Sequence, residues 1–139
     1  MIILGDKKRY KVKINRFEDG LFQAYIDDED GMLMGEISFK IKSGKTWIYN
    51  IATEEAYQHN GIGQALIYVC EYMSATRNVK LIEGKYYPSN EFAKPFYDKN
   101  GYEIIKEGYE TFIQKGIVKC EVLEKLEPLI VKEEITFQI

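Results

Sequence analysis

Histidine and cysteine are scarce in this chain of 139 residues, which holds one histidine, His59, and two cysteines, Cys70 and Cys120. The three residues form no cluster in the sequence, and neither cysteine belongs to a Cys-x-x-Cys pair. Structural zinc sites and disulfide frameworks use closely spaced cysteines and histidines. We therefore expect a protein without a metal, in which both thiols are unpaired.

Long apolar runs are also missing. No apolar stretch reaches the roughly 20 residues that a membrane-spanning helix needs, and residues 1–8 lack the layout of a secretory signal. The formal net charge of −3 disfavours a general nucleic-acid binder. We therefore expect a cytoplasmic protein that binds neither membranes nor nucleic acid, and the length fits one domain over residues 1–139.

The hydrophobic pattern changes once along the chain. Alternating apolar residues predict an antiparallel meander with strands at residues 10–14, 21–26, 32–41 and 47–52. The apolar positions of residues 62–73 then follow the spacing of one helix face, and residues 79–83 predict a further strand. The order strand, helix, strand implies a parallel crossover.

The remainder predicts a second helix, a hairpin and a C-terminal segment. Ser89 or Asn90 is the expected N-cap of this helix, and Pro95 predicts a kink or a late start. Three aromatic residues form its expected apolar side: Phe92, Phe96 and Tyr97. Strands follow at residues 102–106 and 110–115, and the segment 118–139 predicts a short helix to residue 126 and a strand from residue 130.

The most informative segment is Gln58-His59-Asn60-Gly61-Ile62-Gly63, directly before the first predicted helix. Glycines at a helix start leave backbone N–H groups free to face an anion, and the helix dipole adds positive potential there. Such a nest binds phosphate without needing a basic side chain. The segment predicts a phosphorylated ligand, although the same glycines also suit an ordinary helix start.

Other phosphate or ion sites fit these residues poorly. A dinucleotide-binding turn needs a third glycine where Leu66 stands. A P-loop that ends in Gly44-Lys45-Thr46 needs a first glycine where Phe39 stands. An EF-hand loop anchored on Gly31 puts Ile26 at its first ligand position.

Two segments resemble the GNAT-type N-acetyltransferases. Residues 51–66 are similar to the acetyl-CoA-binding motif, in which Gln/Arg-x-x-Gly-x-Gly/Ala lies between a strand and a helix. Residues 90–102 are similar to a second family segment, Asn-x-x-Ala-x-x-x-Tyr-x-x-x-Gly-Phe/Tyr. The resemblance implies an α/β (α+β) fold with a central mixed, mostly antiparallel sheet, splayed fourth and fifth strands and two main helices. The two early helices of the family are missing, since only residues 15–20 join the first two strands.

The resemblance also implies transfer of an acetyl group from acetyl-CoA to a primary amine of a small molecule, peptide or protein, by direct attack in a ternary complex. It assigns the coenzyme A pyrophosphate to a run of backbone N–H groups and the pantetheine arm to a strand edge. The expected pyrophosphate residues are Gln58, His59, Asn60, Gly61, Ile62, Gly63 and Gln64, and those for the pantetheine arm are Ile51, Ala52 and Thr53.

Two residues of the second segment carry further roles in this resemblance. Asn90 is expected to bond the coenzyme A chain, unless it only caps its helix. Tyr97 is expected to contact the cofactor and to protonate the departing thiolate, unless it only packs in the core. No acid stands in residues 46–50, where many family members carry a base, so we name none. The open candidates are Glu36, Glu54, Glu55 and Glu83, beside a water relay or an acceptor of low pKa.

Three further points stay open in the sequence. An aromatic cluster either holds a cationic acceptor or packs at the acceptor side: Trp47, Tyr49, Tyr86 and Tyr87. The alternative function is a non-catalytic coenzyme A-binding or protein-interaction module on the same fold. We also expect the C-terminal segment to pair with a second copy through an exposed strand edge, giving a homodimer.

Overall fold

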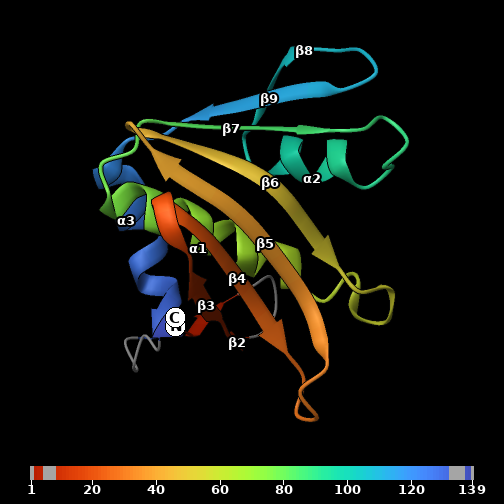
Figure 1. Cartoon of the computed structure of the whole chain (residues 1–139), viewed down its shortest axis with the longest axis vertical. Helices are drawn as coiled ribbons and strands as arrows, with labels where there is room; N and C mark the ends of the chain where they lie inside the picture. The colour runs from red at the N-terminus through yellow and green to blue at the C-terminus, as the bar shows by residue number, and fades with distance from the viewer. Residues whose placement is uncertain (1, 5–8, 132–136, 139) are drawn as a thin grey trace.

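Strands dominate the structure (Figure 1), a computed structural model that describes residues 2–4, 9–131 and 137–138. Their bounds are β1 (Ile2–Leu4), β2 (Arg9–Lys11), β3 (Lys13–Arg16), β4 (Leu21–Asp27), β5 (Leu33–Lys42), β6 (Lys45–Thr53), β7 (Leu81–Tyr86), β8 (Glu103–Lys106), β9 (Thr111–Gly116), β10 (Ile130–Val131) and β11 (Phe137–Gln138). The helices of the described residues are α1 (Ile62–Thr76), α2 (Ala93–Lys99) and α3 (Lys119–Leu126), with the short 3-10 helices η1 (Glu18–Gly20), η2 (Glu55–Tyr57) and η3 (Glu127–Leu129).

The strands form a large sheet and a small one. The large sheet has eight strands in the order β11-β3-β4-β5-β6-β7-β9-β8. Its neighbours pair antiparallel, except that β6 with β7 and β11 with β3 are parallel. The small sheet, β10-β1-β2, is antiparallel. The predicted mixed, mostly antiparallel fold is confirmed, and between β3 and β4 the chain has only the short helix η1.

The N-terminal strand differs from its prediction. The single strand expected at residues 10–14 divides at Val12 into β2 and β3, which belong to different sheets. Tyr10, Val12 and Ile14 are all buried. The alternation of these buried residues predicts a single strand, although β2 and β3 pair with strands of different sheets. The strand expected from residue 130 is confirmed as β10, which pairs with β1 of the same chain. The homodimer and the single domain stay predictions.

The core lies between the large sheet and helix α1. Figure 1 shows α1 behind β4, β5 and β6, and α3 packs on α1. The buried face of α1 carries the predicted apolar residues, among them Leu66, Val69 and Met73. A buried hydrogen bond of 2.7 Å joins the hydroxyls of Thr46 on β6 and Ser74 on α1, which fixes the helix along the sheet. Helix and sheet together therefore position the N-terminus of α1 beside the end of β6.

Helix α2 begins late. Its N-cap is Phe92, without a side-chain cap, so the prediction of Ser89 or Asn90 as N-cap is wrong. Asn90 Oδ1 instead accepts the N–H of Phe92 at 3.2 Å, one turn before the helix. Pro95 is the third helical residue, where a backbone N–H has no partner within the helix in any case. The expected late start is confirmed, and proline is tolerated there for this reason.

The parallel pairing of β6 and β7 stops halfway along β6. It runs from the pair Lys45 and Leu81 to the pair Ile48 and Gly84, and the strands then diverge. Against β5, Phe39 faces Ile48 but Ser38 faces Asn50, so Tyr49 is an extra residue in β6. Such a bulge bends its strand, which explains why β6 turns away from β7. Figure 1 shows the two strands diverging, with α2 drawn between their ends.

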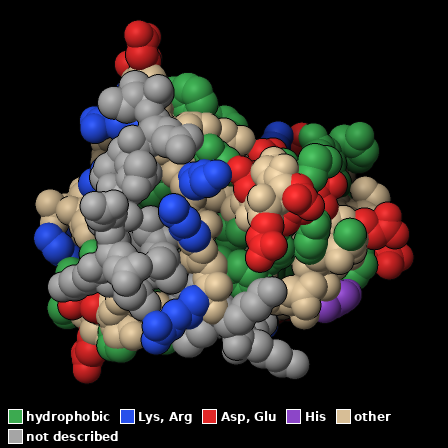
Figure 2. Space-filling model, turned by 90° about the horizontal axis from the view of Figure 1, so that it is seen from below, with side chains coloured by type: hydrophobic (Ala, Val, Ile, Leu, Met, Phe, Trp, Pro, Cys, Tyr) green, Lys and Arg blue, Asp and Glu red, His purple; other side chains and the backbone are tan. Residues whose placement is uncertain are grey.

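Charge is unevenly distributed over the surface. Exposed acidic residues lie in two neighbouring segments, the β4–β5 turn and the loop after β6: Glu29, Asp30, Glu54 and Glu55. Figure 2 shows acidic side chains gathered on one side of a face whose other side carries basic ones. None of the helices in the described residues is long and apolar enough to cross a membrane.

A buried ion pair ties α1 to β9. Both carboxylate oxygens of Glu71 accept hydrogen bonds from Lys115 Nζ, at 3.0 and 3.2 Å. The side chain of Glu71 is 3% exposed and that of Lys115 is 21% exposed. Burial raises the pKa of Glu71, and the ammonium of Lys115 opposes that rise. The ammonium of Lys115 therefore stabilises the charged carboxylate of Glu71, which burial disfavours.

Removing this lysine should destabilise the fold strongly. We expect Lys115→Met to lower the free energy of unfolding by about 3 kcal/mol, since a buried carboxylate loses its partner. Lys45→Met, which breaks the exposed pair with Glu83, should cost less than about 1 kcal/mol. Urea unfolding measures both. The double variant Glu71→Leu with Lys115→Met should recover most of the loss, and a double variant as unstable as Lys115→Met contradicts this account.

Candidate functional site

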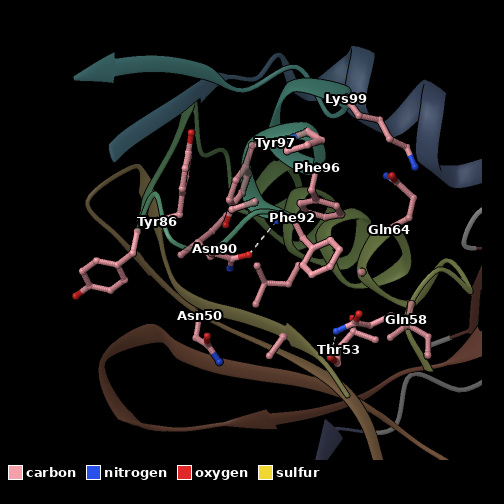
Figure 3. Close-up of a pocket in the computed structure, with 18 of the residues that line it drawn as sticks. Asn50, Thr53, Gln58, Gln64, Tyr86, Asn90, Phe92, Phe96, Tyr97 and Lys99 are labelled. Atoms are coloured by element: carbon pink, nitrogen blue, oxygen red, sulfur yellow. Dashed lines mark hydrogen bonds between the residues drawn. The ribbon is translucent and has the colours of Figure 1, made fainter. Parts of the chain in front are cut away.

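The diverging strands enclose a cavity of about 750 Å³ (Figure 3). Its walls come from the end of β6, the loop and first turn of α1, the end of β7, and α2. All the predicted site residues except Asn60 line it: Ile51, Ala52, Thr53, Gln58, His59, Gly61, Ile62, Gly63, Gln64, Asn90 and Tyr97. Two motifs that are far apart in the sequence thus face one another across a single space.

One wall is a strand edge without a strand partner. Residues 50–53 of β6 pair with β5 on one side, and residues 49–53 have lost β7 on the other. Their remaining N–H and C=O groups therefore face the cavity, where an extended ligand with amide groups can bond them as a further strand would. Ile51 and Thr53 are half-buried and Ala52 is exposed, so the backbone rather than a large side chain forms this wall.

The start of α1 forms an open nest of N–H groups. Gly61, the N-cap, has φ 81°, and His59 has φ 66°, so both residues are in the left-handed region. No side chain caps the helix, and the N–H of Ala65 makes the first helical hydrogen bond, to the carbonyl of Gly61 at 3.0 Å. The N–H groups of Ile62, Gly63 and Gln64 consequently have no helical partner, and the helix dipole favours an anion there.

The space beside Gly63 is restricted by α2. A Cβ on Gly63 would lie 3.3 Å from the ring of Phe96, so a larger residue would push α2 away from α1. The absence of a side chain at Gly63 thus lets α2 pack over the nest and leaves the backbone there open to close approach.

Hydrogen bonds hold the loop before α1 in place. The hydroxyl of Tyr57 donates to Asp28 Oδ2 at 2.7 Å, which lowers the pKa of that carboxyl, and the hydroxyl of Tyr10 donates to the carbonyl of Asn60. The side chain of Asn60 donates to the carbonyl of Tyr57 at 3.2 Å. Asn60 thus braces the loop and, unlike the other predicted site residues, does not line the cavity.

Gln64 also has a structural task. Its side chain is 3% exposed and donates through Nε2 to Asn100 Oδ1 at 2.6 Å. Asn100 in turn donates to the carbonyl of Phe96 at 2.9 Å. This bridge joins the start of α1 to the end of α2, so the contact predicted for Gln64 falls to its backbone N–H. Lys99 lines the same end of the cavity, and Figure 3 shows its side chain pointing toward Gln64.

Tyr97 is held rigidly with its hydroxyl toward the cavity. The residue is 4% exposed, and its ring lies 5.9 Å from that of Tyr86 and 5.3 Å from that of Tyr102, centroid to centroid. Among the described residues its hydroxyl has no hydrogen-bond partner, and in Figure 3 it points into the cavity. Burial raises the pKa of Tyr97, and the neighbouring Cys70 adds to the rise. A protonated phenol is thus available to a ligand.

Asn90 lies on the same wall as Tyr97. Its Oδ1 accepts a hydrogen bond from the N–H of Phe92, while its Nδ2 has no hydrogen-bond partner among the described residues. The amide of Asn90 can therefore donate a hydrogen bond to a carbonyl in the cavity.

The expected aromatic cluster is divided between two places. Tyr49, Tyr86 and Tyr87 line the large cavity at the end away from the nest. Trp47 instead lines a separate cavity of about 140 Å³, together with Glu83. None of the candidate bases lines the large cavity: Glu36, Glu54, Glu55 and Glu83.

Several lining residues were not predicted. Lys85 and Asn50 reach the cavity because β7 and β6 separate there, which no local pattern indicates. Phe92, Phe96 and Lys99 follow the i, i+4, i+7 spacing of one helix face, a signal that was present. Phe92 was expected on a packed apolar side and is instead 59% exposed, because α2 begins only after it.

Known structures share this architecture. The PaiA N-acetyltransferase of Thermoplasma acidophilum, solved in complex with coenzyme A, is 22% identical with a TM-score of 0.61, over 70% of this chain and 60% of that one. The ribosomal-protein-S18-alanine N-acetyltransferase of Escherichia coli is 18% identical with a TM-score of 0.64, over 73% and 72%. A GNAT-family acetyltransferase of Staphylococcus aureus is 15% identical with a TM-score of 0.67, over 72% and 70%.

At such low identities these likenesses show the fold, and this chain spans less than two thirds of the Thermoplasma acidophilum protein. Comparison with curated protein sequences gives no match. The family described as "Acetyltransferase (GNAT) domain" matches residues 19–104, more than half of the 139 residues, and includes both sides of the cavity. The chain therefore belongs to the GNAT acetyltransferase family, as residues 51–66 and 90–102 predict.

Proposed function

We propose that the protein transfers the acetyl group of acetyl-CoA to a primary amine of a small molecule, peptide or protein, by direct attack in a ternary complex. The observation that carries this proposal is that one cavity joins an anion nest, an unpaired strand edge and a buried phenol. These three features match, in this order, the pyrophosphate, the amide-containing arm and the thioester of acetyl-CoA.

The donor binds mainly through backbone groups in this proposal. The pyrophosphate rests on the N–H groups at the start of α1, and Lys99 adds positive charge at that end. The pantetheine arm runs along residues 51–53 of β6, with Asn90 donating to one of its carbonyls. The thioester then lies near Tyr97, between the diverging strands.

The departing sulfur must be stabilised as the C–S bond breaks. The amine nitrogen attacks the thioester carbonyl carbon and releases a proton to water, the C–S bond breaks, and the sulfur leaves as a thiolate. Tyr97 donates a hydrogen bond to this sulfur and can supply its proton, which the phenolate then regains from water, and positioned acids typically contribute about 10²–10⁴-fold. Because burial raises its pKa, the phenol stays protonated at neutral pH.

The cysteines support direct attack over an acetylated enzyme. Cys70 lies in the core, and burial raises the pKa of its thiol, which keeps the reactive thiolate scarce. Cys120 is exposed on α3 and does not line the cavity. Neither thiol is therefore suited to carry the acetyl group.

The acceptor must lose a proton before it attacks. An amine with a lysine-like pKa near 10.4 costs roughly 4.6 kcal/mol to deprotonate at pH 7, and a peptide α-amino group with a pKa near 8 costs roughly 1.4 kcal/mol. The described residues that line the cavity include no carboxylate to act as the base. A water relay or an acceptor of low pKa fits this lining.

A thiol-release assay over amines, peptides and aminoglycosides tests the proposed function. We expect coenzyme A to be released from acetyl-CoA in proportion to at least one acceptor, with an N-acetylated product in the mass spectrum. Calorimetric binding of coenzyme A without release for any acceptor favours the non-catalytic module instead. Absence of binding at millimolar concentration refutes both versions.

We expect substitution of the glycine in the nest to weaken coenzyme A binding more than substitution of a glycine of similar φ elsewhere. Gly61→Ala should weaken coenzyme A binding at least tenfold in calorimetry, because relief of left-handed strain, roughly 1–2 kcal/mol, rotates the N–H groups of the nest. Gly44 has φ 76° in the β5–β6 turn, does not line the cavity, and a Cβ there meets nothing within 4 Å. Gly44→Ala carries similar strain and should leave binding unchanged. Equal effects of the two substitutions argue against the nest.

Tyr97→Phe should leave coenzyme A binding intact and lower kcat more than tenfold, because the sulfur loses its hydrogen-bond donor. Tyr102→Phe is the matched control: its ring lies 5.3 Å from that of Tyr97, and Tyr102 is buried and does not line the cavity. Steady-state kinetics with an identified acceptor measures both variants. An unchanged kcat for Tyr97→Phe removes the proposed role.

A further inference from the structure

Phe92 is a large apolar side chain in an unexpected position. It is 59% exposed although it directly precedes α2, whose neighbouring aromatic residues Phe96 and Tyr97 are covered. Figure 3 shows its ring over the cavity, between Asn90 and Gln58. A phenylalanine left in water at the rim of a ligand cavity gains the most when a flat apolar partner covers it.

The ring of Phe92 lies beside the nest. Its centroid is 6.1 Å from that of His59, with an interplanar angle of 70°, so the two rings meet edge to face. His59 belongs to the loop before α1 and Phe92 to the segment before α2, and both line the cavity. The pair therefore spans the cavity at its phosphate end, away from Tyr97.

We propose that Phe92, supported at its edge by His59, is the platform on which the adenine ring of coenzyme A stacks. This inference rests on the proposed function, which makes coenzyme A the ligand. Adenine is the only flat aromatic part of that ligand, and a single ribose separates it from the pyrophosphate. The base must therefore settle within one sugar of the nest, where Phe92 lies.

Charge at the same end suits the rest of the nucleotide. Lys99 is the last residue of α2, follows Phe92 by seven residues in the sequence, and also lines the cavity. Its ammonium is placed to attract the phosphate on the ribose of coenzyme A. Stacking of a base on an aromatic side chain depends little on hydrogen bonding, so this platform adds affinity for the nucleotide without touching the reacting thioester.

The test compares ligands with and without adenosine. Calorimetry of the full chain is run with coenzyme A and with 4′-phosphopantetheine, which keeps the pantetheine arm and one phosphate. Phe92→Ala should raise the Kd for coenzyme A about tenfold and leave the Kd for 4′-phosphopantetheine unchanged. Phe17→Ala removes a phenylalanine that is 51% exposed and does not line the cavity, and it should change neither value.

A second variant gives an optical readout. Phe92→Trp should preserve affinity for coenzyme A, and its added fluorescence should be quenched by coenzyme A but not by 4′-phosphopantetheine. Equal loss of both ligands in Phe92→Ala overturns the inference, because the ring then contacts the pantetheine arm. An unchanged Kd for coenzyme A also overturns it. If the unsubstituted protein binds neither ligand, the proposed function itself fails.

Discussion

The cavity exists because a parallel strand pair ends where Ile48 faces Gly84. Beyond that pair, β6 keeps its hydrogen bonds to β5 but has lost those to β7, so five residues present an unpaired backbone edge. The carbonyl of Thr53 accepts a hydrogen bond from Gln58 Nε2 at 3.5 Å, and the other groups of this edge are left for a ligand or water. The extra residue at Tyr49 maintains the separation, since closing the gap would require the bulge to be removed.

Hydrogen bonds tie the nest end of the cavity to the rest of the fold. The bond from Tyr57 to Asp28 ties the loop before α1 to the β4–β5 turn, and the bridge from Gln64 to Asn100 ties α1 to α2. A site that is already ordered does not lose loop entropy on binding. This explains why two motif residues, Asn60 and Gln64, contribute their side chains to the scaffold, and why only Gln64 of the two lines the cavity.

The sequence predicted the parts of the structure that local patterns encode. The alternating strands, the helical spacing from Ile62 and the glycines beside it led to the correct fold and family. It could not predict where the pairing of β6 with β7 stops, because that depends on a bulge set by β5. It also placed Phe92 on the apolar side of the second helix, because periodicity alone cannot tell that this helix begins only at Ala93.

The two ends of the cavity differ in how they are built, and this decides what can be inferred about each substrate. The donor end uses backbone N–H groups, whose exposure requires glycine at Gly61 and so leaves a mark in the sequence. The acceptor end is lined by Tyr49, Lys85 and Tyr87, which meet only because two strands diverge. Lys85 Nζ lies 3.1 Å from Glu110 Oε1, so the charge of this lysine is already paired. The lysine by itself therefore favours neither an anionic nor a cationic acceptor. Selection at this end then falls to the shape between the tyrosines and to the pKa of the amine.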